Sequence, residues 1–255
     1  MKGIFCTAAA AALIASCAHA QPASEAAATN PGAVIESFAA DFAHDPYNNR
    51  AATFGVEVDE AWWTVALTPG QAARVTPGRP SEPTLYFTMD AATLARIDAG
   101  TMNALTAMAR AKQNDPTPMD IEFMEGTAPD VAWAIPLIFH FWTRGQPEVI
   151  PFHGDVTRVT HGANTGIFYY QPGFRSGFFR VDPGQHVNAD PTERTNPFPS
   201  LIIITRGRVN ARIGGRDFVL NEGEAVLIQP EVSHEFLNEF DTPGEGLLFM
   251  FGEGA

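Results

Sequence analysis

The fold is decided by residues 200–238, whose sequence is Ser-Leu-Ile-Ile-Ile-Thr-Arg-Gly-Arg-Val-Asn-Ala-Arg-Ile-Gly-Gly-Arg-Asp-Phe-Val-Leu-Asn-Glu-Gly-Glu-Ala-Val-Leu-Ile-Gln-Pro-Glu-Val-Ser-His-Glu-Phe-Leu-Asn. Short apolar runs alternate with turn residues, a pattern that predicts about four or five strands joined by tight turns. Gly214-Gly215 can supply the positive φ angles of a two-residue hairpin. On the strand before it, Val209, Ala211 and Ile213 alternate with polar residues, which predicts one buried and one wet face.

This segment also resembles a known family. The run 223–238 is similar to the second conserved motif of the cupins, in which a glycine, a proline, a histidine and an asparagine recur at about this spacing. The turns 181–184 and 206–207 resemble those of the first cupin motif. The matching residues of the second motif are Gly223, Pro230, His234 and Asn238. The resemblance implies an all-β jelly-roll barrel, which we expect over residues 155–255.

Length and charge limit the classes of function. The chain has 255 residues, of which 45% are hydrophobic, enough for one large or two ordinary domains. Its 29 acidic residues outnumber 16 basic ones, for a net charge of -13. Because such a surface repels polyanions, we exclude nucleic acid as a partner and expect no electrostatic attraction to an anionic membrane.

The first 20 residues have the pattern of a signal peptide. Lys2 is followed by a short apolar run over 4–15, and Ala18-His19-Ala20 fits a cleavage site. Alternatively, Cys17 lies in a sequence that resembles a bacterial lipoprotein box and would be lipidated. Both alternatives predict an exported protein, periplasmic or lipid-anchored in the bacterial cell envelope. Residues 21–31 have the composition of a flexible tether.

Cysteine usage excludes thiol chemistry in the folded body. The chain has 2 cysteines, Cys6 and Cys17, and both lie in the signal region. The mature protein is therefore expected to have no disulfide and no thiolate metal site.

Residues 32–145 alternate between helical and strand patterns. Apolar spacing predicts helices over 33–43, 90–100, 103–112 and 133–142, and strands over 62–67 and 84–89. Asp90 is the expected N-cap of the second helix. His140, alone among apolar neighbours, is expected to be a hydrogen-bonded interior side chain rather than a ligand.

A second resemblance lies in this region. The strand ending at Asp90, the helix that contains Leu94, the passage Gly100-Thr-Met-Asn103 and Ala107 resemble the sterol-carrier-protein-like fold, an α/β domain around a lipid-sized apolar tunnel. The lysine and glycines that usually follow are replaced by 112–116. The resemblance implies that one apolar cavity holds a ligand against Phe87, Leu94, Leu105, Met108 and Leu137. The predicted fold class is therefore α+β, with a sterol-carrier-like α/β domain followed by a cupin barrel.

The cupin resemblance also implies a metal centre of three histidines and a carboxylate. Only His234 stands where the motif expects a ligand; Asp190 and Thr192 replace histidines, and Ser200 replaces the glutamate. We therefore predict no metal or other cofactor. The alternative is a variant divalent-metal site in which a loop folds over the barrel mouth, with the ligands His186, Asp190, Glu193 and His234.

Two arginines offer a polar contact for a ligand. The passage 168–180 is rich in aromatic residues and contains Arg175 and Arg180, either of which can anchor an anionic head group inside a cavity lined by phenylalanine. The predicted strands here are 166–170 and 176–181.

Two functions remain open. The sequence favours an exported, non-catalytic protein that binds a small hydrophobic ligand or lipid in its N-terminal domain, with the cupin domain as a second binding or interaction module. The alternative is a metal-dependent cupin enzyme, oxygenase-like or isomerase-like, built around His234. Membrane contact is expected only through the signal or a lipid anchor, and the long apolar strands permit a homodimer.

Overall fold

The structure, a computed structural model, describes residues 30–82, 85–112, 114–123, 131–143 and 149–255. The predicted signal peptide, including Cys6 and Cys17, lies outside these residues, as does nearly all of the predicted tether. None of the helices in the described ranges combines the length and the apolarity required to span a membrane.

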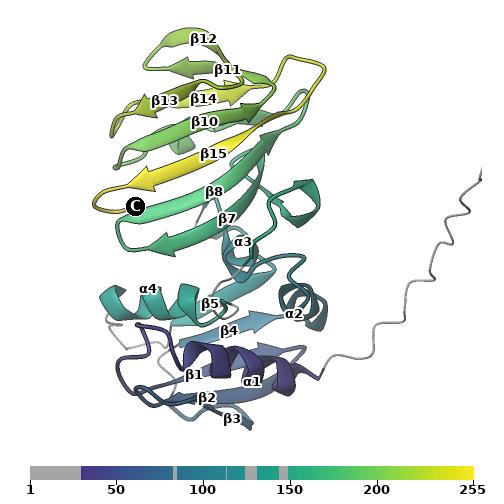
Figure 1. The fold of residues 1–255 in the computed structure, drawn as a ribbon, viewed down its shortest axis with the longest axis vertical. Coiled ribbons are helices and arrows are strands. Elements are labelled where there is room, and N and C mark those ends of the chain that lie inside the picture. The colour runs from purple at the N-terminus through teal and green to yellow at the C-terminus, as the bar shows by residue number, and fades with distance from the viewer. Residues whose placement is uncertain (1–29, 83–84, 113, 124–130, 144–148) are drawn as a thin grey trace, which may run out of the picture.

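The N-terminal region, residues 30–143, is built on a five-stranded sheet in the order β3-β2-β1-β4-β5 (Figure 1). β1 runs parallel to β4, and the other neighbours are antiparallel. The predicted strands over 62–67 and 84–89 are confirmed as β2 and β4. The strands are β1 (Ala52–Val58), β2 (Ala61–Leu67), β3 (Arg74–Pro77), β4 (Leu85–Met89) and β5 (Met119–Phe123).

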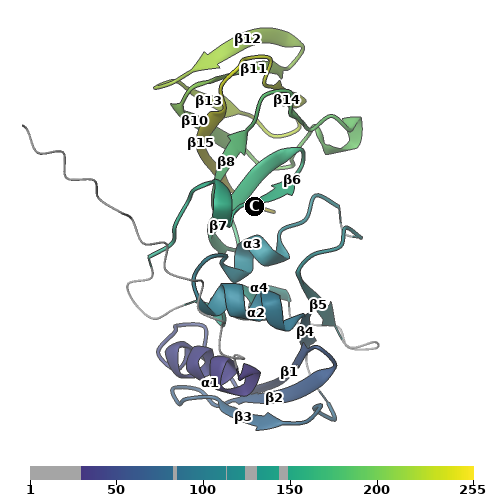
Figure 2. The same ribbon diagram turned by 90° about the vertical axis from the view of Figure 1, so that its right-hand side faces the viewer.

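In the described part of this region four helices accompany the sheet: α1 (Pro31–Phe42), α2 (Ala91–Asp98), α3 (Ala104–Met108) and α4 (Val131–His140). The side chain of Asp90 accepts a hydrogen bond from the Thr93 amide, which confirms its role as the N-cap of α2. Pro136 lies inside α4 rather than in its first turn. Figure 2 shows α2, α3 and α4 between the N-terminal sheet and the C-terminal strands, so these helices form the contact layer between the two regions.

The helix predicted over 103–112 is wrong in length, because α3 ends at Met108. Ala109 adopts an extended backbone conformation, with φ -61° and ψ 133°. The carbonyl oxygens of Thr106, Ala107 and Ala109 accept hydrogen bonds from the Arg158 side chain of the C-terminal region. A tertiary contact therefore replaces the next helical turn.

Large side chains fill the interior of the N-terminal region. Phe54, Phe87 and Phe141 are completely buried, and their rings meet edge to face. His140 is buried, and its Nδ1 lies 3.1 Å from a carboxylate oxygen of Asp45, which confirms that it is a hydrogen-bonded interior side chain.

The C-terminal region, residues 149–255, consists mainly of two antiparallel sheets, in the orders β13-β10-β15-β8-β7-β6 and β12-β11-β14-β9. No strand ladder among the described residues joins the two sheets, so the expected barrel is a two-layer arrangement. Val181, Ile204, Val209 and Leu220 are among the buried residues between the layers. The strands are β6 (Arg158–Thr160), β7 (Ala163–Gln171), β8 (Phe174–Val181), β9 (His186–Val187), β10 (Ser200–Arg206), β11 (Arg208–Ile213), β12 (Arg216–Asn221), β13 (Ala225–Ile228), β14 (His234–Leu237) and β15 (Gly244–Phe251).

The meander predicted over 200–238 is confirmed as β10 to β14. Gly214 and Gly215 have φ angles of 56° and 76° and join β11 to β12 in the expected hairpin. Val209 and Ala211 are buried on one face of β11. Two short 3-10 helices, Gly154–Val156 and Pro191–Glu193, complete this region.

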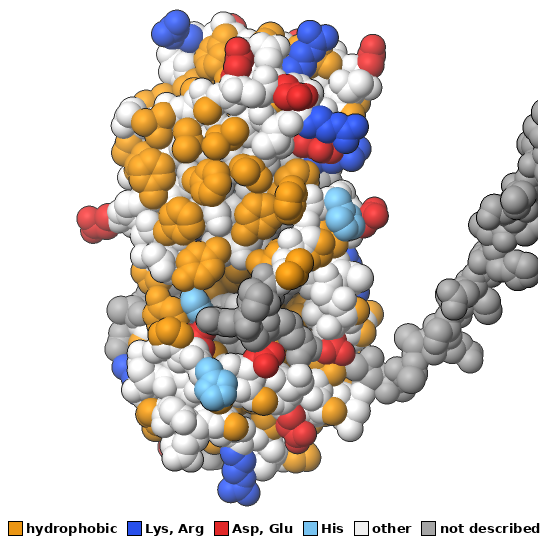
Figure 3. All heavy atoms as spheres, viewed as in Figure 1, with side chains coloured by type: hydrophobic (Ala, Val, Ile, Leu, Met, Phe, Trp, Pro, Cys, Tyr) orange, Lys and Arg blue, Asp and Glu red, His pale blue; other side chains and the backbone are white. Residues whose placement is uncertain are grey.

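The outer face of the six-stranded sheet is apolar. Because antiparallel partners project to the same face, the paired positions Tyr169, Ser176, Phe249, Leu201 and Leu227 form one row across five strands. Leu227 is 50% exposed. Figure 3 shows hydrophobic side chains gathered over these strands, which face the viewer as in Figure 1.

Candidate ligand-binding cavity

The interior of the C-terminal region contains a cavity of about 420 Å³. Its walls come from the inward-facing positions of both sheets, which alternate along each strand with the outward-facing positions. Apolar side chains dominate these walls. They include Ile167, Phe179, Val181, Ile202, Phe236 and Leu248.

The N-terminal region completes the cavity. Leu105 and Met108 of α3 and Phe139 of α4 line it together with the strands. Phe139 packs on Tyr170 of β7, with ring centroids 4.2 Å apart. The cavity is therefore shared between two parts of the chain that lie far apart in the sequence.

Three sets of hydrogen bonds hold α3 against β6 and β7. The Asn103 side chain donates to the carbonyl of Ile167, and the amide of Ile167 donates to the hydroxyl of Thr106, at 2.9 Å. Nη1 of Arg158 donates to the carbonyls of Thr106 and Ala107 in the last turn of α3 and of Ala109 just after it, the shortest contact being 2.7 Å to Ala109. Burial lowers the pKa of Arg158, and nearby Arg110 lowers it further, but a guanidinium stays protonated at neutral pH.

One group of polar side chains in the cavity consists of His161, Glu193 and His234. Nδ1 of His161 lies 3.3 Å from a carboxylate oxygen of Glu193, whose other oxygen is 3.4 Å from Nζ of Lys112. Lys112 also pairs with Asp190. The loop that contains Glu193 is therefore tied both to the β6–β7 turn and to the N-terminal region.

His234 is a buried residue that lines the cavity. Burial lowers its pKa and the nearby charge of His161 contributes in the same direction, whereas the hydrogen bond to the Val232 carbonyl raises it. Nδ1 of His234 lies 3.0 Å from the carbonyl oxygen of Val232, so in the neutral ring Nδ1 carries the proton and donates it. Nε2 is then left as a hydrogen-bond acceptor.

Arg175 lines a second polar part of the cavity. Its guanidinium lies over the rings of Tyr170 and Phe198, 5.2 Å from each centroid, and Nη2 donates to the carbonyl of Gly254 at 2.9 Å. Nε is buried and has no hydrogen-bond partner among the described residues. Arg175 therefore faces this cavity.

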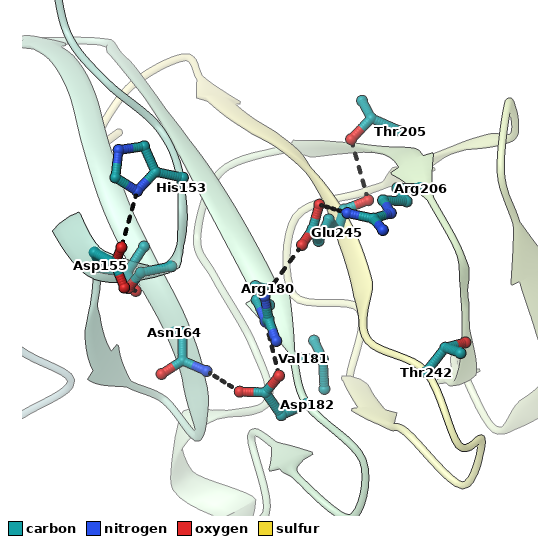
Figure 4. Close-up of polar contacts among 12 residues, drawn as sticks. His153, Asp155, Asn164, Arg180, Val181, Asp182, Thr205, Arg206, Thr242 and Glu245 are labelled. Atoms are coloured by element: carbon teal, nitrogen blue, oxygen red, sulfur yellow. Dashed lines mark hydrogen bonds and ion pairs between the residues drawn. The ribbon is translucent and has the colours of Figure 1, made fainter. Parts of the chain in front are cut away.

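Arg180, the other arginine considered as an anchor for a head group, does not line this cavity. Arg175 and Arg180 are five positions apart on one strand and therefore project to opposite faces. Nε of Arg180 pairs with Asp182 at 2.7 Å, and Nη1 lies 3.5 Å from Glu245 (Figure 4). Figure 4 also shows Arg206 on the other side of Glu245, where its Nη1 is 3.9 Å from the carboxylate.

The variant metal set suggested by the sequence is not brought together. His186 pairs with Glu235 at 2.8 Å, and Asp190 pairs with Lys112 at 2.5 Å. Only Glu193 and His234 of the four residues line the cavity. Within the described ranges, no group of three or more His, Cys, Asp or Glu side chains is arranged to hold an ion. The residues therefore do not fit the metal centre that the cupin resemblance implies.

The five apolar side chains expected to share an N-terminal cavity are divided. Leu105 and Met108 line the cavity in the C-terminal region, whereas Phe87, Leu94 and Leu137 do not. Those three are at most 1% exposed and belong to the packed N-terminal core. Phe87, for example, meets Trp142 edge to face at 5.4 Å.

Several cavity residues were not singled out in the sequence. Phe139 was expected only as part of an apolar helix, and Phe198 and His161 lie in connections with no pattern of their own. Because every second residue of a strand projects to the same face, placing Arg175 in the cavity also predicts that Phe179 and Val181 line it. Ser200, noted where a cupin glutamate would stand, does line the cavity and accepts a hydrogen bond from the side chain of Asn196 at 3.4 Å.

Residues 177–250 match the family model described as cupin domain. A cupin 2 conserved barrel domain protein from Salinispora arenicola CNS-205 is similar over 41% of this chain and 88% of its own, with 16% identity and a TM-score of 0.36. The plu4264 protein from Photorhabdus luminescens matches over 41% and 87%, with 14% identity and a TM-score of 0.36.

The cupin domain of Cnp3 from Schizosaccharomyces pombe matches over 42% of this chain and 76% of its own, with 9% identity and a TM-score of 0.36. A comparison with curated proteins found no significant match. The predicted cupin resemblance is confirmed by the family match, since the matched residues 177–250 contain His234 and the whole meander over 200–238. The C-terminal region of this chain therefore contains a cupin domain.

Proposed function

We propose that this protein is a non-catalytic binding protein whose small hydrophobic or lipid ligand occupies the cavity between the cupin sheets and helices α3 and α4. The observation that carries the proposal is the cavity of about 420 Å³. This volume lies in the range of about 300–1,000 Å³ that is usual for small-molecule sites. Its apolar walls with a few polar groups are also typical of such sites.

The N-terminal region is proposed to close this site. Leu105, Met108 and Phe139 contribute apolar surface, and the Arg158 contacts hold α3 in place. We retain a sterol-carrier-like α/β fold for residues 32–145 as a proposal, supported by a mixed sheet with helices beside it. The proposed ligand position differs from the one the resemblance implied, because Phe87, Leu94 and Leu137 pack in the core.

The proposal is tested by native mass spectrometry of the mature protein purified from its host envelope. We expect a fraction of the molecules to retain a hydrophobic compound that organic extraction removes. Recovery of the unliganded mass alone, together with no binding of added hydrophobic probes, would refute the proposed function.

We propose that this function needs no metal, so metal analysis separates it from the enzymatic alternative. The geometry supports this because His186 and Asp190 are engaged by Glu235 and Lys112. We expect His234→Ala to leave the metal content unchanged. Stoichiometric iron, manganese, nickel or zinc that is lost in this variant would instead establish a cupin enzyme.

Export is proposed from the signal pattern over residues 1–20. The mature chain is expected to begin at Gln21, and the lipoprotein alternative would place lipidated Cys17 first. Intact-mass measurement on the envelope fraction distinguishes the two products. A full-length product in the cytoplasm would contradict both.

We also propose that two copies associate through the apolar outer face of the six-stranded sheet (Figure 3). Two ion pairs, Arg180 with Asp182 and Arg206 with Glu245, lie at one end of this sheet, so the face carries both positive and negative side chains. We propose that a two-fold axis places the arginines of one copy opposite the carboxylates of the other. Light scattering should give the dimer mass for the wild type and the monomer mass for Leu201→Arg; a monomeric wild type would contradict the proposal.

A further inference from the structure

We propose that the ligand is an amphiphile with a single carboxylate head group, and that Arg175 binds this carboxylate. The inference rests on the proposed function, because it names the chemistry of the molecule that occupies the same cavity. It starts from a positive charge that has no counter-charge among the residues that the structure describes.

Arg175 is a half-buried cation in the cavity wall. No ion pair joins it to a carboxylate within the described part of the chain, and its one hydrogen bond is to the carbonyl of Gly254. Tyr170 and Phe198 flank the guanidinium with apolar ring faces. Burying a charge without a partner is costly, so this arrangement favours an anion supplied from outside the chain.

The unsatisfied atom indicates where the anion would bind. Nε of Arg175 is buried and donates to no described group, while Nη2 already has an acceptor. A carboxylate that accepts from Nε would satisfy the orphaned donor and neutralise the charge in one contact. Charge-assisted hydrogen bonds of this kind are among the stronger polar contacts in proteins.

The other charges in the cavity are already compensated. Arg110 pairs with Asp120 at 2.7 Å, and Glu193 lies between Lys112 and His161. Within the described ranges, one unpaired cation in the cavity wall matches one negative charge, which favours a monocarboxylate over a more highly charged head group.

The position of Arg175 leaves room for an apolar tail. Arg175 pairs with Tyr170 and Met250, while Val181 is six positions further along β8 and pairs with Gly244. At about 3.3 Å per residue, these two cavity-lining positions are roughly 20 Å apart. Phe179, Leu248 and Ile202 line the walls between the strands and would contact the tail.

Calorimetric titration of the mature protein with decanoate and with decanol tests the assignment. The two probes have the same chain length and differ in head-group charge at neutral pH. We expect the wild type to bind decanoate at least about tenfold more tightly than decanol, since a hydrogen bond to a charged group contributes on this scale.

In Arg175→Met the ratio of the two affinities should fall to about one, and Arg175→Lys should regain part of the preference. Arg180→Met is the matched control, because it removes an arginine from the outer face of the same strand, and its ratio should equal that of the wild type. Equal affinities in the wild type, or an unchanged preference in Arg175→Met, would overturn the inference and leave the proposed function standing. Failure of the wild type to bind either probe would overturn both.

Discussion

The two regions of this molecule differ in how completely side chains fill their interiors. In the N-terminal region, completely buried rings such as Phe54, Phe87 and Phe141 pack edge to face, and Leu137 is fully enclosed among them. In the C-terminal region, the two sheets enclose a cavity of about 420 Å³. A filled interior stabilises a fold, whereas a hollow one offers a ligand surface that the chain has not covered itself. The comparison moves the expected ligand site from the first region to the second.

The largest difference in stability should come from replacing one leucine by alanine in each region. Leu137→Ala creates a new hole in a filled core and should lower the free energy of unfolding by about 2–5 kcal/mol. Leu248→Ala enlarges a space that already exists and removes fewer packing contacts, so we expect a loss of about 1 kcal/mol. Urea unfolding of both variants measures the difference. Equal losses would mean that the C-terminal interior is as tightly packed as the N-terminal one.

A smaller effect should follow from loosening the contact between the regions. Arg158→Met leaves the carbonyls of Thr106, Ala107 and Ala109 without their charged donor, at an expected cost of about 1.5–3 kcal/mol. Hydrogen exchange in α3 should accelerate, because the helix loses its main polar contact with the C-terminal region. Arg212→Met is the control, since Arg212 forms an exposed pair with Asp217. Equal free energies of unfolding and equal exchange rates in α3 for the two variants would show that Arg158 does not hold the regions together.

The smallest effect concerns the buried imidazole of the cavity. Burial lowers the pKa of His234 in the folded protein below its ordinary value of about 6.5. Below that pH the unfolded chain binds a proton that the folded chain resists, so the wild type should lose stability as the pH falls from about 7 to 5. His234→Gln should reduce this loss. Melting temperatures across the range provide the measurement, and parallel curves for the two proteins would show that His234 does not titrate as described.

Local signals in the sequence predicted much of the fold. Asp90 caps α2 as expected, and Gly214-Gly215 forms the hairpin between β11 and β12, because both depend on a few adjacent residues. α3 was predicted too long, since its end is set by Arg158, which lies 49 residues after Ala109. Residue patterns do not contain such a long-range contact.

The candidate site was harder to predict for the same reason. Arg175 was identified together with Arg180, and only the pairing of β8 with its neighbours distinguishes the inward residue from the outward one. Leu105 and Met108 were assigned to an N-terminal cavity, although they face the cupin sheets. Their apolar spacing shows that they are buried, but not which region they pack against.

Binding of a neutral hydrophobic fluorophore, N-phenylnaphthylamine, tests most directly whether the space between the cupin sheets is a ligand site. Leu248 lines the cavity, while Leu247, its neighbour on β15, projects to the opposite face. Direct excitation of the fluorophore should show saturable binding to the wild type and to Leu247→Trp. Leu248→Trp, which places a larger side chain inside the cavity, should weaken that binding at least about tenfold while the protein remains folded. Undiminished binding by folded Leu248→Trp would show that the ligand site lies elsewhere.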